Sequence, residues 1–154
     1  MCPLADNISP MAVDEGPVTV VGDDEAWKLM SSVTLGRLVT YFGGQLEIFP
    51  VNFAVQNGTV LFRTAEGTKL FTAVMNDQVL FEVDAHSVTD GWSVVVRGTA
   101  HVLSSAEEIR DAEQVRLLPW IPTVKLRYVR VTPSEVSARR FKFGPEPDQG
   151  QVPG

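Results

Sequence analysis

Residues 35–63 read LGRLVTYFGGQLEIFPVNFAVQNGTVLFR and contain two hairpin signals close together. Gly43-Gly44 and Asn57-Gly58 suit the positive φ angles that two-residue hairpin turns require. The runs around them are rich in branched and aromatic residues, which favour strands. This stretch therefore predicts three antiparallel strands, at residues 35–42, 45–56 and 59–63.

The rest of the chain continues this pattern on both sides. Further strands are predicted at residues 79–85, 92–103, 126–131 and 135–143, and short helices at 24–32, 64–75 and 104–117. Asp23 or Asp24 is expected to cap the first helix, and Ser104 or Ser105 the last. The links between strands are too short for parallel crossovers. An antiparallel sheet of this size tends to close, so the fold class is mainly β: a six- to seven-stranded antiparallel barrel with short covering helices.

Length and composition indicate one domain. The chain has 154 residues, within the usual range of a single domain. Its two ends, residues 1–16 and 144–154, mix proline, glycine and polar residues without a period, which predicts disorder. The folded domain is expected to span residues 17–143.

Charge and cysteine content exclude several classes of protein. Thirteen basic residues against nineteen acidic ones give a net charge of -6, which disfavours a protein that tracks nucleic-acid phosphates. No apolar run approaches the ~20 residues of a membrane helix, and no signal peptide opens the chain. The single cysteine, Cys2, leaves no internal disulfide. A cytoplasmic protein without nucleic-acid or membrane partners is expected.

Residues 62–70, FRTAEGTKL, place two cations around a turn between a strand and a helix. The first main-chain N–H groups of a helix have no partner within it and, with the helix dipole, favour an anion. Two hydroxyls and a glycine that allows close approach complete a set suited to a phosphate. The candidate residues are Arg63, Thr64, Ala65, Gly67, Thr68 and Lys69, with Glu66 as the discordant member unless its side chain turns outward.

A simpler interpretation of the same turn remains open on these residues alone. Thr64 can be the N-cap of an ordinary helix, with the neighbouring charges merely solvated. Pro50 lies inside the strand predicted at 45–56, where a proline marks a bulge, an edge or a place where the ladder opens. Asn52, two residues later, offers both a donor and an acceptor, although it can equally pair with the main chain.

Residues 24–141 resemble the flavin-binding split barrels related to pyridoxamine 5'-phosphate oxidase. The branch that they resemble most includes nitroimidazole-resistance-type proteins and actinobacterial flavin/deazaflavin oxidoreductases. The resemblance depends on the order and spacing of four segments rather than on any one of them. These are Gly36-Arg37-Leu38, Pro50-Val51-Asn52, the 62–70 stretch, and Gly91-Trp92-Ser93-Val94-Val95-Val96-Arg97-Gly98.

The resemblance implies a homodimeric six-stranded split barrel with one FMN at each end of the subunit interface. It assigns the 63–69 turn to the FMN phosphate, and Pro50, Val51 and Asn52 to the strand along the isoalloxazine ring. Trp92 and Trp120 become candidates for a ring wall contributed across the dimer. A buried core or interface role is the alternative for either tryptophan.

The implied function is a flavin-dependent oxidoreductase that passes a hydride to a small or flat organic substrate. Two alternatives stay open: a deazaflavin-dependent reductase, and a non-enzymatic flavin or haem binder that serves as a sensor or store. The flavin itself carries this chemistry, so no catalytic side chain is required.

No second chemistry is predicted from the remaining polar residues. His86 and His101 lack clustered partners, so no metal site is expected. Asp77, Glu82 and Asp84 are expected to face solvent rather than to form an acid/base pair.

Overall fold

The computed structural model describes residues 16–75, 78–117 and 126–145. In these residues, seven strands form one sheet and three short helices cover parts of it. The predictions for Cys2, Asp77 and Trp120, and almost all of both terminal segments, lie outside these residues. The strands are β1 (Val18–Val21), β2 (Leu35–Phe42), β3 (Gln45–Gln56), β4 (Thr59–Ala65), β5 (Gln78–His86), β6 (Asp90–Val102) and β7 (Leu126–Lys142). The helices are α2 (Asp23–Ser31), α3 (Lys69–Val74) and α4 (Ala106–Ala112).

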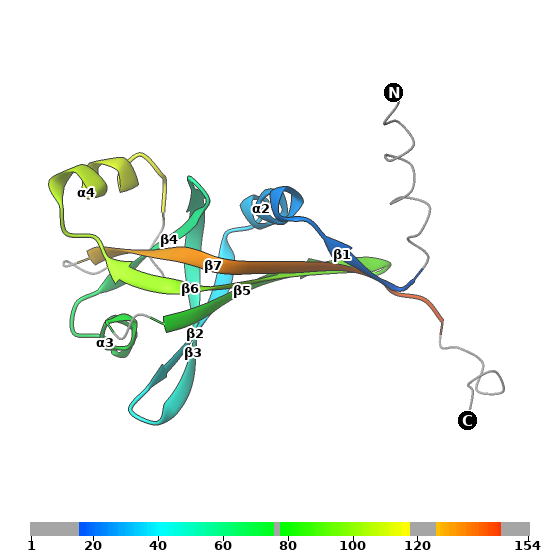
Figure 1. Cartoon of the computed structure of the whole chain (residues 1–154), viewed down its shortest axis with the longest axis horizontal. Coiled ribbons are helices and arrows are strands. Elements are labelled where there is room, and N and C mark those ends of the chain that lie inside the picture. The colour runs from blue at the N-terminus through cyan, green and yellow to red at the C-terminus, as the bar shows by residue number, and fades with distance from the viewer. Residues whose placement is uncertain (1–15, 76–77, 118–125, 146–154) are drawn as a thin grey trace.

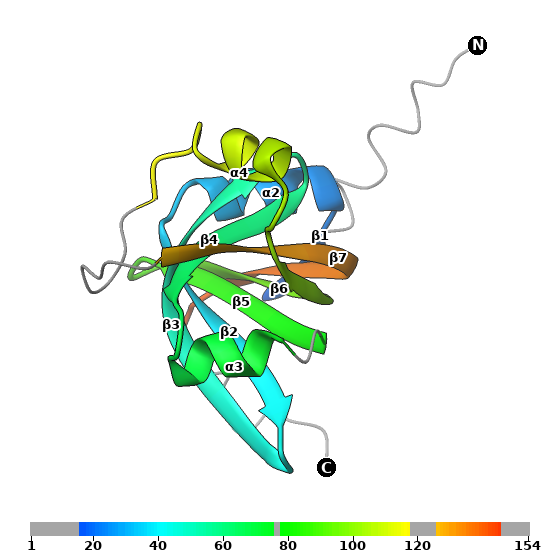
Figure 2. The same ribbon diagram turned by 90° about the vertical axis from the view of Figure 1, so that its left-hand side faces the viewer.

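The sheet closes on itself. Its strand order is β1-β7-β4-β3-β2-β5-β6, with an additional pairing of β6 with β7, and every pairing is antiparallel. Six strands therefore form a ring, and β1 extends it along the last part of β7. Figures 1 and 2 show β7 running across the molecule, with β4 and β1 at its two ends. The predicted antiparallel barrel is confirmed.

The last strand is longer than predicted. Residues 126–131 and 135–143, expected as two strands, form the single strand β7. Its pairing with β6 shifts register between Arg97 and Gly98, opposite Pro133. The shift absorbs the irregular residues at 132–134 without ending the strand, because an extra residue in one strand of a ladder is accommodated as a bulge. Strand β1 is a further element that the sequence pattern did not predict.

All three helices begin at other residues than expected, at Asp23, Lys69 and Ala106 instead of residues 24, 64 and 104, and α4 ends at Ala112 instead of residue 117. Gly22, not Asp23 or Asp24, is the N-cap of α2, without a side-chain cap bond. Helix α3 begins at Lys69, because Thr64 and Ala65 continue strand β4. Ser105 caps α4 as one of the two expected candidates, in a capping box with Glu108.

Two clusters of buried side chains stabilise this arrangement. The larger fills the barrel and takes in Ala26 and Met30 of α2 and Val74 of α3. The smaller lies on the opposite face of β4, where Leu61 packs with Leu103, Ala112 and Leu117 beneath α4. Strand β4 is thus buried on both faces. Within the described part of the chain, no helix is long and apolar enough to cross a membrane.

Candidate functional site

Strands β3 and β4 pair only near the turn that joins them and then part. Their pairing runs from Gln56↔Thr59 to Phe53↔Phe62 and stops there. Beyond that point β3 continues beside β2, down to Phe42↔Gln45, whereas β4 continues beside β7, up to Ala65↔Leu126. At Pro50, strand β3 pairs with β2 alone, so Pro50 lies at an edge that forms where the β3–β4 ladder opens.

Asn52 and Arg63 are the first residues beyond the last paired position. Arg63 faces away from the barrel interior, because its neighbours Phe62 and Thr64 are buried in it. Its guanidinium lies over the ring of Tyr128, 5.0 Å from the centroid. Its Nε is buried and has no hydrogen-bond partner among the described residues. A buried donor of a cation without an acceptor is costly, so this atom marks a position suited to an anionic or polar acceptor.

The two threonines of the predicted phosphate turn bind each other. Thr68 donates its hydroxyl to the Ala65 carbonyl at 2.7 Å and accepts the main-chain N–H of Phe71 at 3.1 Å. Since the Thr68 proton is thus used, Thr64 is the donor in the 3.2 Å contact between the two hydroxyls. Thr68, and not Thr64, is therefore the cap of α3, and both hydroxyl protons are engaged within the turn.

The charged residues of the turn are paired as well. Lys69 Nζ lies 2.6 Å from Glu47 Oε1 of β3, and Glu66 forms an ion pair with Arg127 of β7. Glu66 is thus directed to a cation, which removes it as an obstacle to an anion. Gly67 has φ +83°, a left-handed conformation that favours glycine. The turn needs this glycine for its backbone.

The strand predicted to lie along a ring has residues on both faces. Val51 is buried in the barrel core, whereas Pro50 is exposed and lies opposite Arg37 of β2. Asn52 lies opposite Leu35, is half-buried, and makes polar contact within the structure. Pro50 and Asn52 therefore share the outer face with Arg63, while Val51 can contribute only its main chain to that face.

Trp92 lies far from this opening in the same chain. It pairs with Arg140 on β7, whereas Arg63 pairs with Tyr128, twelve residues earlier along that strand. At ~3.3 Å per residue this separation is about 40 Å along β7. The Trp92 side chain packs against the main core. Any shared site with Arg63 thus requires a second copy of the chain, as the resemblance implies.

Strand alternation brings together three charged residues that sequence reasoning left apart. Arg37 Nη1 of β2 lies 3.0 Å from Glu82 Oε1 and 3.4 Å from Asp84 Oδ2, both on β5. Glu82 lies on the outer face, as expected, but its side chain is only 27% exposed and is therefore half-buried there. Burial, and then the neighbouring Asp84 carboxylate, raise the pKa of Glu82 to about 7, although Arg37 opposes this shift. The i, i+2 spacing of the two acids on a strand was the available signal.

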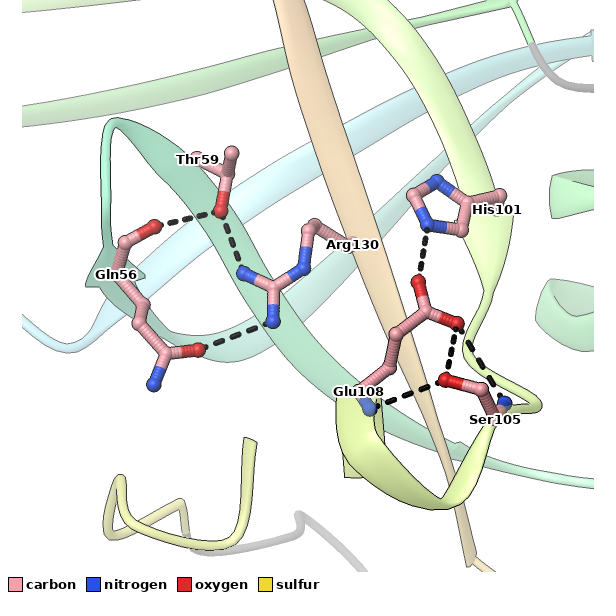
Figure 3. A network of polar contacts seen from close by, with 6 residues as sticks. All are labelled: Gln56, Thr59, His101, Ser105, Glu108 and Arg130. Carbon is pink, nitrogen blue, oxygen red and sulfur yellow. Dashed lines mark hydrogen bonds and ion pairs between the residues drawn. The ribbon is translucent and has the colours of Figure 1, made fainter. Parts of the chain in front are cut away.

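A second polar network joins α4 to the sheet (Figure 3). Arg130 of β7 donates to Thr59 at 2.7 Å and to Gln56 at 3.0 Å. Gln56 in turn donates to the Asp111 carbonyl of α4. His101 lies 3.5 Å from Glu108. Hydrogen bonds from Ser105, and to a lesser degree His101, lower the pKa of Glu108. This network holds α4 over the face that carries Arg63. No group of three or more metal-ligating side chains occurs among the residues described.

Comparison with known proteins places the chain in a family. The family model described as pyridoxamine 5'-phosphate oxidase matches residues 22–140. The uncharacterized protein Rv0080 of Mycobacterium tuberculosis is 34% identical over 149 residues, covering 92% of this chain and 95% of that protein. A second uncharacterized protein of that organism, Rv3129, is 55% identical over 98 residues, covering 64% of this chain and 89% of its own length.

A solved structure supports the same assignment. The structure of the FAD binding protein from Mycobacterium smegmatis is 48% identical, with a TM-score of 0.74, and covers 81% of this chain and 98% of that one. The residues matched by the family model, 22–140, include the opening between β3 and β4 and the 63–69 turn. The chain belongs to the pyridoxamine 5'-phosphate oxidase family.

Proposed function

We propose that this protein is a homodimeric, flavin-dependent oxidoreductase that acts on a small or flat organic substrate and uses FMN. The observation that supports this proposal most strongly is the buried Arg63 Nε, which has no partner among the described residues and lies where β3 and β4 part. Family membership and the name of the Mycobacterium smegmatis relative support a flavin in this position. That name gives FAD, so the identity of the flavin is part of the test.

The residues present fit a phosphate in an adapted form of the predicted set. Arg63 and Lys69 supply two positive charges, and Gly67 lets the main chain approach closely. The hydroxyls of Thr64 and Thr68 hold the turn in shape rather than donate outward. Lys69 is 69% exposed, so it can leave Glu47 for a phosphate at little cost.

The bound flavin would supply hydride transfer, and the chain would supply binding, orientation and exclusion of water. Pro50 and Asn52 present an outer strand surface that main-chain pairing with β4 does not cover. Asn52 can donate to or accept from a ring edge. This part of the site needs no acid or base from the protein.

The outer face of β2, β3 and β5 suits a second copy of the chain. Leu46 and Ile48 of β3 are 73% and 61% exposed, and Tyr41 of β2 is 60% exposed. Val39 of β2 and Leu80 of β5 line a hollow of about 140 Å³ together with Tyr41 and Leu46, and Ile48 lies opposite Val39. We call these five residues the apolar patch. Contiguous exposed apolar surface of this kind marks interaction sites. Pro50 and Asn52 continue the same face, so a partner on the patch would border the flavin site.

A direct test is the absorbance spectrum of the purified protein, recorded again after incubation with FMN or FAD and desalting. We expect flavin bands that survive desalting, and chromatography of the released cofactor identifies it. The double variant Arg63→Ala, Lys69→Ala is expected to lose the flavin. The matched control Lys28→Ala, Arg110→Ala removes the same charge from exposed positions on α2 and α4 and is expected to keep it.

Three outcomes would redirect the proposal. Stoichiometric flavin in the Arg63, Lys69 double variant would exclude the assigned turn. A colourless protein that rejects both flavins but binds a deazaflavin would indicate the deazaflavin-dependent reductase. Bound flavin without turnover of quinones, nitroaromatics or tetrapyrroles would favour the sensor or store.

A further inference from the structure

The cluster of Arg37, Glu82 and Asp84 lies on the outer face, beside the apolar patch. All three residues face outward, because their neighbours along the strands are buried in the barrel. These neighbours are Leu38 on β2 and Phe81 and Val83 on β5. On this outer face, Val39 of the patch is the next residue after Arg37 along β2, and Leu80 of the patch is the one before Glu82 along β5. A second copy that covers the patch would therefore also cover the cluster.

Few other charges reach Glu82. Its neighbour on β6 is Val95, and the neighbour of Arg37 on β3 is Pro50, neither of which is charged. Arg97 of β6 is the next cation on this face, and it is paired with Glu135 of β7 at 3.7 Å. The charge state of Glu82 is thus governed by Arg37, Asp84 and burial.

The cluster changes its net charge near neutral pH. With Glu82 protonated, Arg37 and Asp84 balance and the cluster is neutral; with Glu82 ionised, the cluster carries one negative charge. Burial and Asp84 already raise the pKa of Glu82 to about 7 in the single chain. Two copies meeting through the same patch would bring two such clusters into a region shielded from water, where an uncompensated charge is costly.

We propose that protonation of the Arg37–Glu82–Asp84 cluster tightens the association of two copies through the apolar patch. This inference depends on the proposed homodimer but not on the flavin. The cluster is self-complementary when neutral, since the cation of one copy can approach a carboxylate of the other. Association then takes up protons, because covering the cluster disfavours the ionised form of Glu82.

The test is the dimer dissociation constant, measured by sedimentation equilibrium between about pH 6 and pH 8.5. We expect the wild-type Kd to rise by roughly tenfold or more across this range, because each copy contributes one linked proton. Glu82→Gln keeps the shape of the protonated acid, so its Kd is expected to stay low and independent of pH. Glu135→Gln, on the same face but 67% exposed in its wild-type form, is the matched control and should follow the wild type.

Each remaining outcome contradicts the inference. A wild-type Kd that does not change with pH would do so, as would Glu82→Gln with the wild-type slope, or a monomer at every pH. Leu46→Asp should abolish association at every pH; a dimer that persists in this variant would show that another surface is used. The flavin content of the same samples, read from absorbance, separates failure of the cofactor assignment from failure of this linkage.

Discussion

Arg63 shows how one side chain can be more informative than the motif around it. The sequence placed it in a group of six candidate residues, whereas the structure separates that group by strand alternation. Arg63 lies on the outer face over Tyr128, and Thr64 lies in the barrel core. The alternation follows from strand geometry, because β4 extends two residues further than its pattern predicted.

We expect Arg63→Gln to weaken flavin binding by roughly tenfold to a hundredfold, the usual range for losing a charged hydrogen bond. Fluorescence titration of the free flavin measures this change. Arg63→Lys should recover only part of the affinity, because lysine lacks the planar fork. Wild-type affinity in Arg63→Gln would mean that the phosphate lies elsewhere.

The raised pKa of Glu82 leads us to expect a specific pH dependence of folding stability. Its pKa is raised to about 7 in the folded chain, so between the ordinary carboxyl pKa and about 7 the folded state binds more protons than the unfolded state. The contribution of Glu82 to stability is therefore greatest at low pH and decreases as pH rises through about 7.

Replacing the titrating carboxyl of Glu82 by an amide should reveal this pH dependence. We expect the free energy of unfolding of Glu82→Gln to gain on that of the wild type as pH increases from about 5 to 8. Urea denaturation at several pH values, at a concentration that keeps the protein monomeric, measures the difference. A difference that stays constant with pH would contradict the assigned pKa.

At the scale of elements, α3 and the β6–β7 ladder depend on local features that the sequence only partly indicates. The helix has six residues, too few to be stable without its cap and its packing against the barrel. The ladder depends on a register shift next to Gly98.

Thr68→Ala should destabilise the protein by about 0.5–2 kcal/mol, the usual cost of losing a hydroxyl N-cap. The variant removes the acceptor for Phe71 N–H and leaves the buried Thr64 hydroxyl without its partner. Thr68→Ser keeps the cap and should remain close to the wild type. Equal stability of all three proteins in urea would show that α3 does not depend on this bond.

Gly98→Ala should cost about 1–3 kcal/mol, as expected for overpacking. A Cβ at this position would lie 2.3 Å from the Thr132 carbonyl oxygen, and main chain cannot move aside as easily as a side chain can. Gly144→Ala is the control, since nothing lies within 4 Å of its added Cβ. Thermal denaturation compares the two; similar melting temperatures would mean that the bulge adjusts freely.

At the scale of the whole molecule, the barrel buries one set of apolar residues and leaves another on its outer face. Leu38 is fully buried in the core, and Leu46 is 73% exposed in the patch, although both lie on the same hairpin. The same substitution at the two positions therefore distinguishes folding from association.

Leu38→Ala should destabilise the folded chain by about 2–5 kcal/mol at any protein concentration, because it leaves a cavity. Leu46→Ala should leave the dilute protein unchanged and lower its melting temperature only at concentrations where the wild type is dimeric. Differential scanning calorimetry over a range of concentrations checks both. A concentration-independent loss in Leu46→Ala would place its role in folding instead.

The sequence by itself determined the antiparallel barrel, the two hairpins and the candidate turn at 63–69. These follow from local signals: turn residues, branched runs and their spacing. It could not determine that β7 is continuous, that Thr68 caps α3, or that Arg63 and Thr64 face opposite ways, because these depend on where paired strands end. Nor could it bring Arg37 to Glu82, forty-five residues apart. Only the closed sheet sets that register, because it is fixed by contacts between residues distant in the chain.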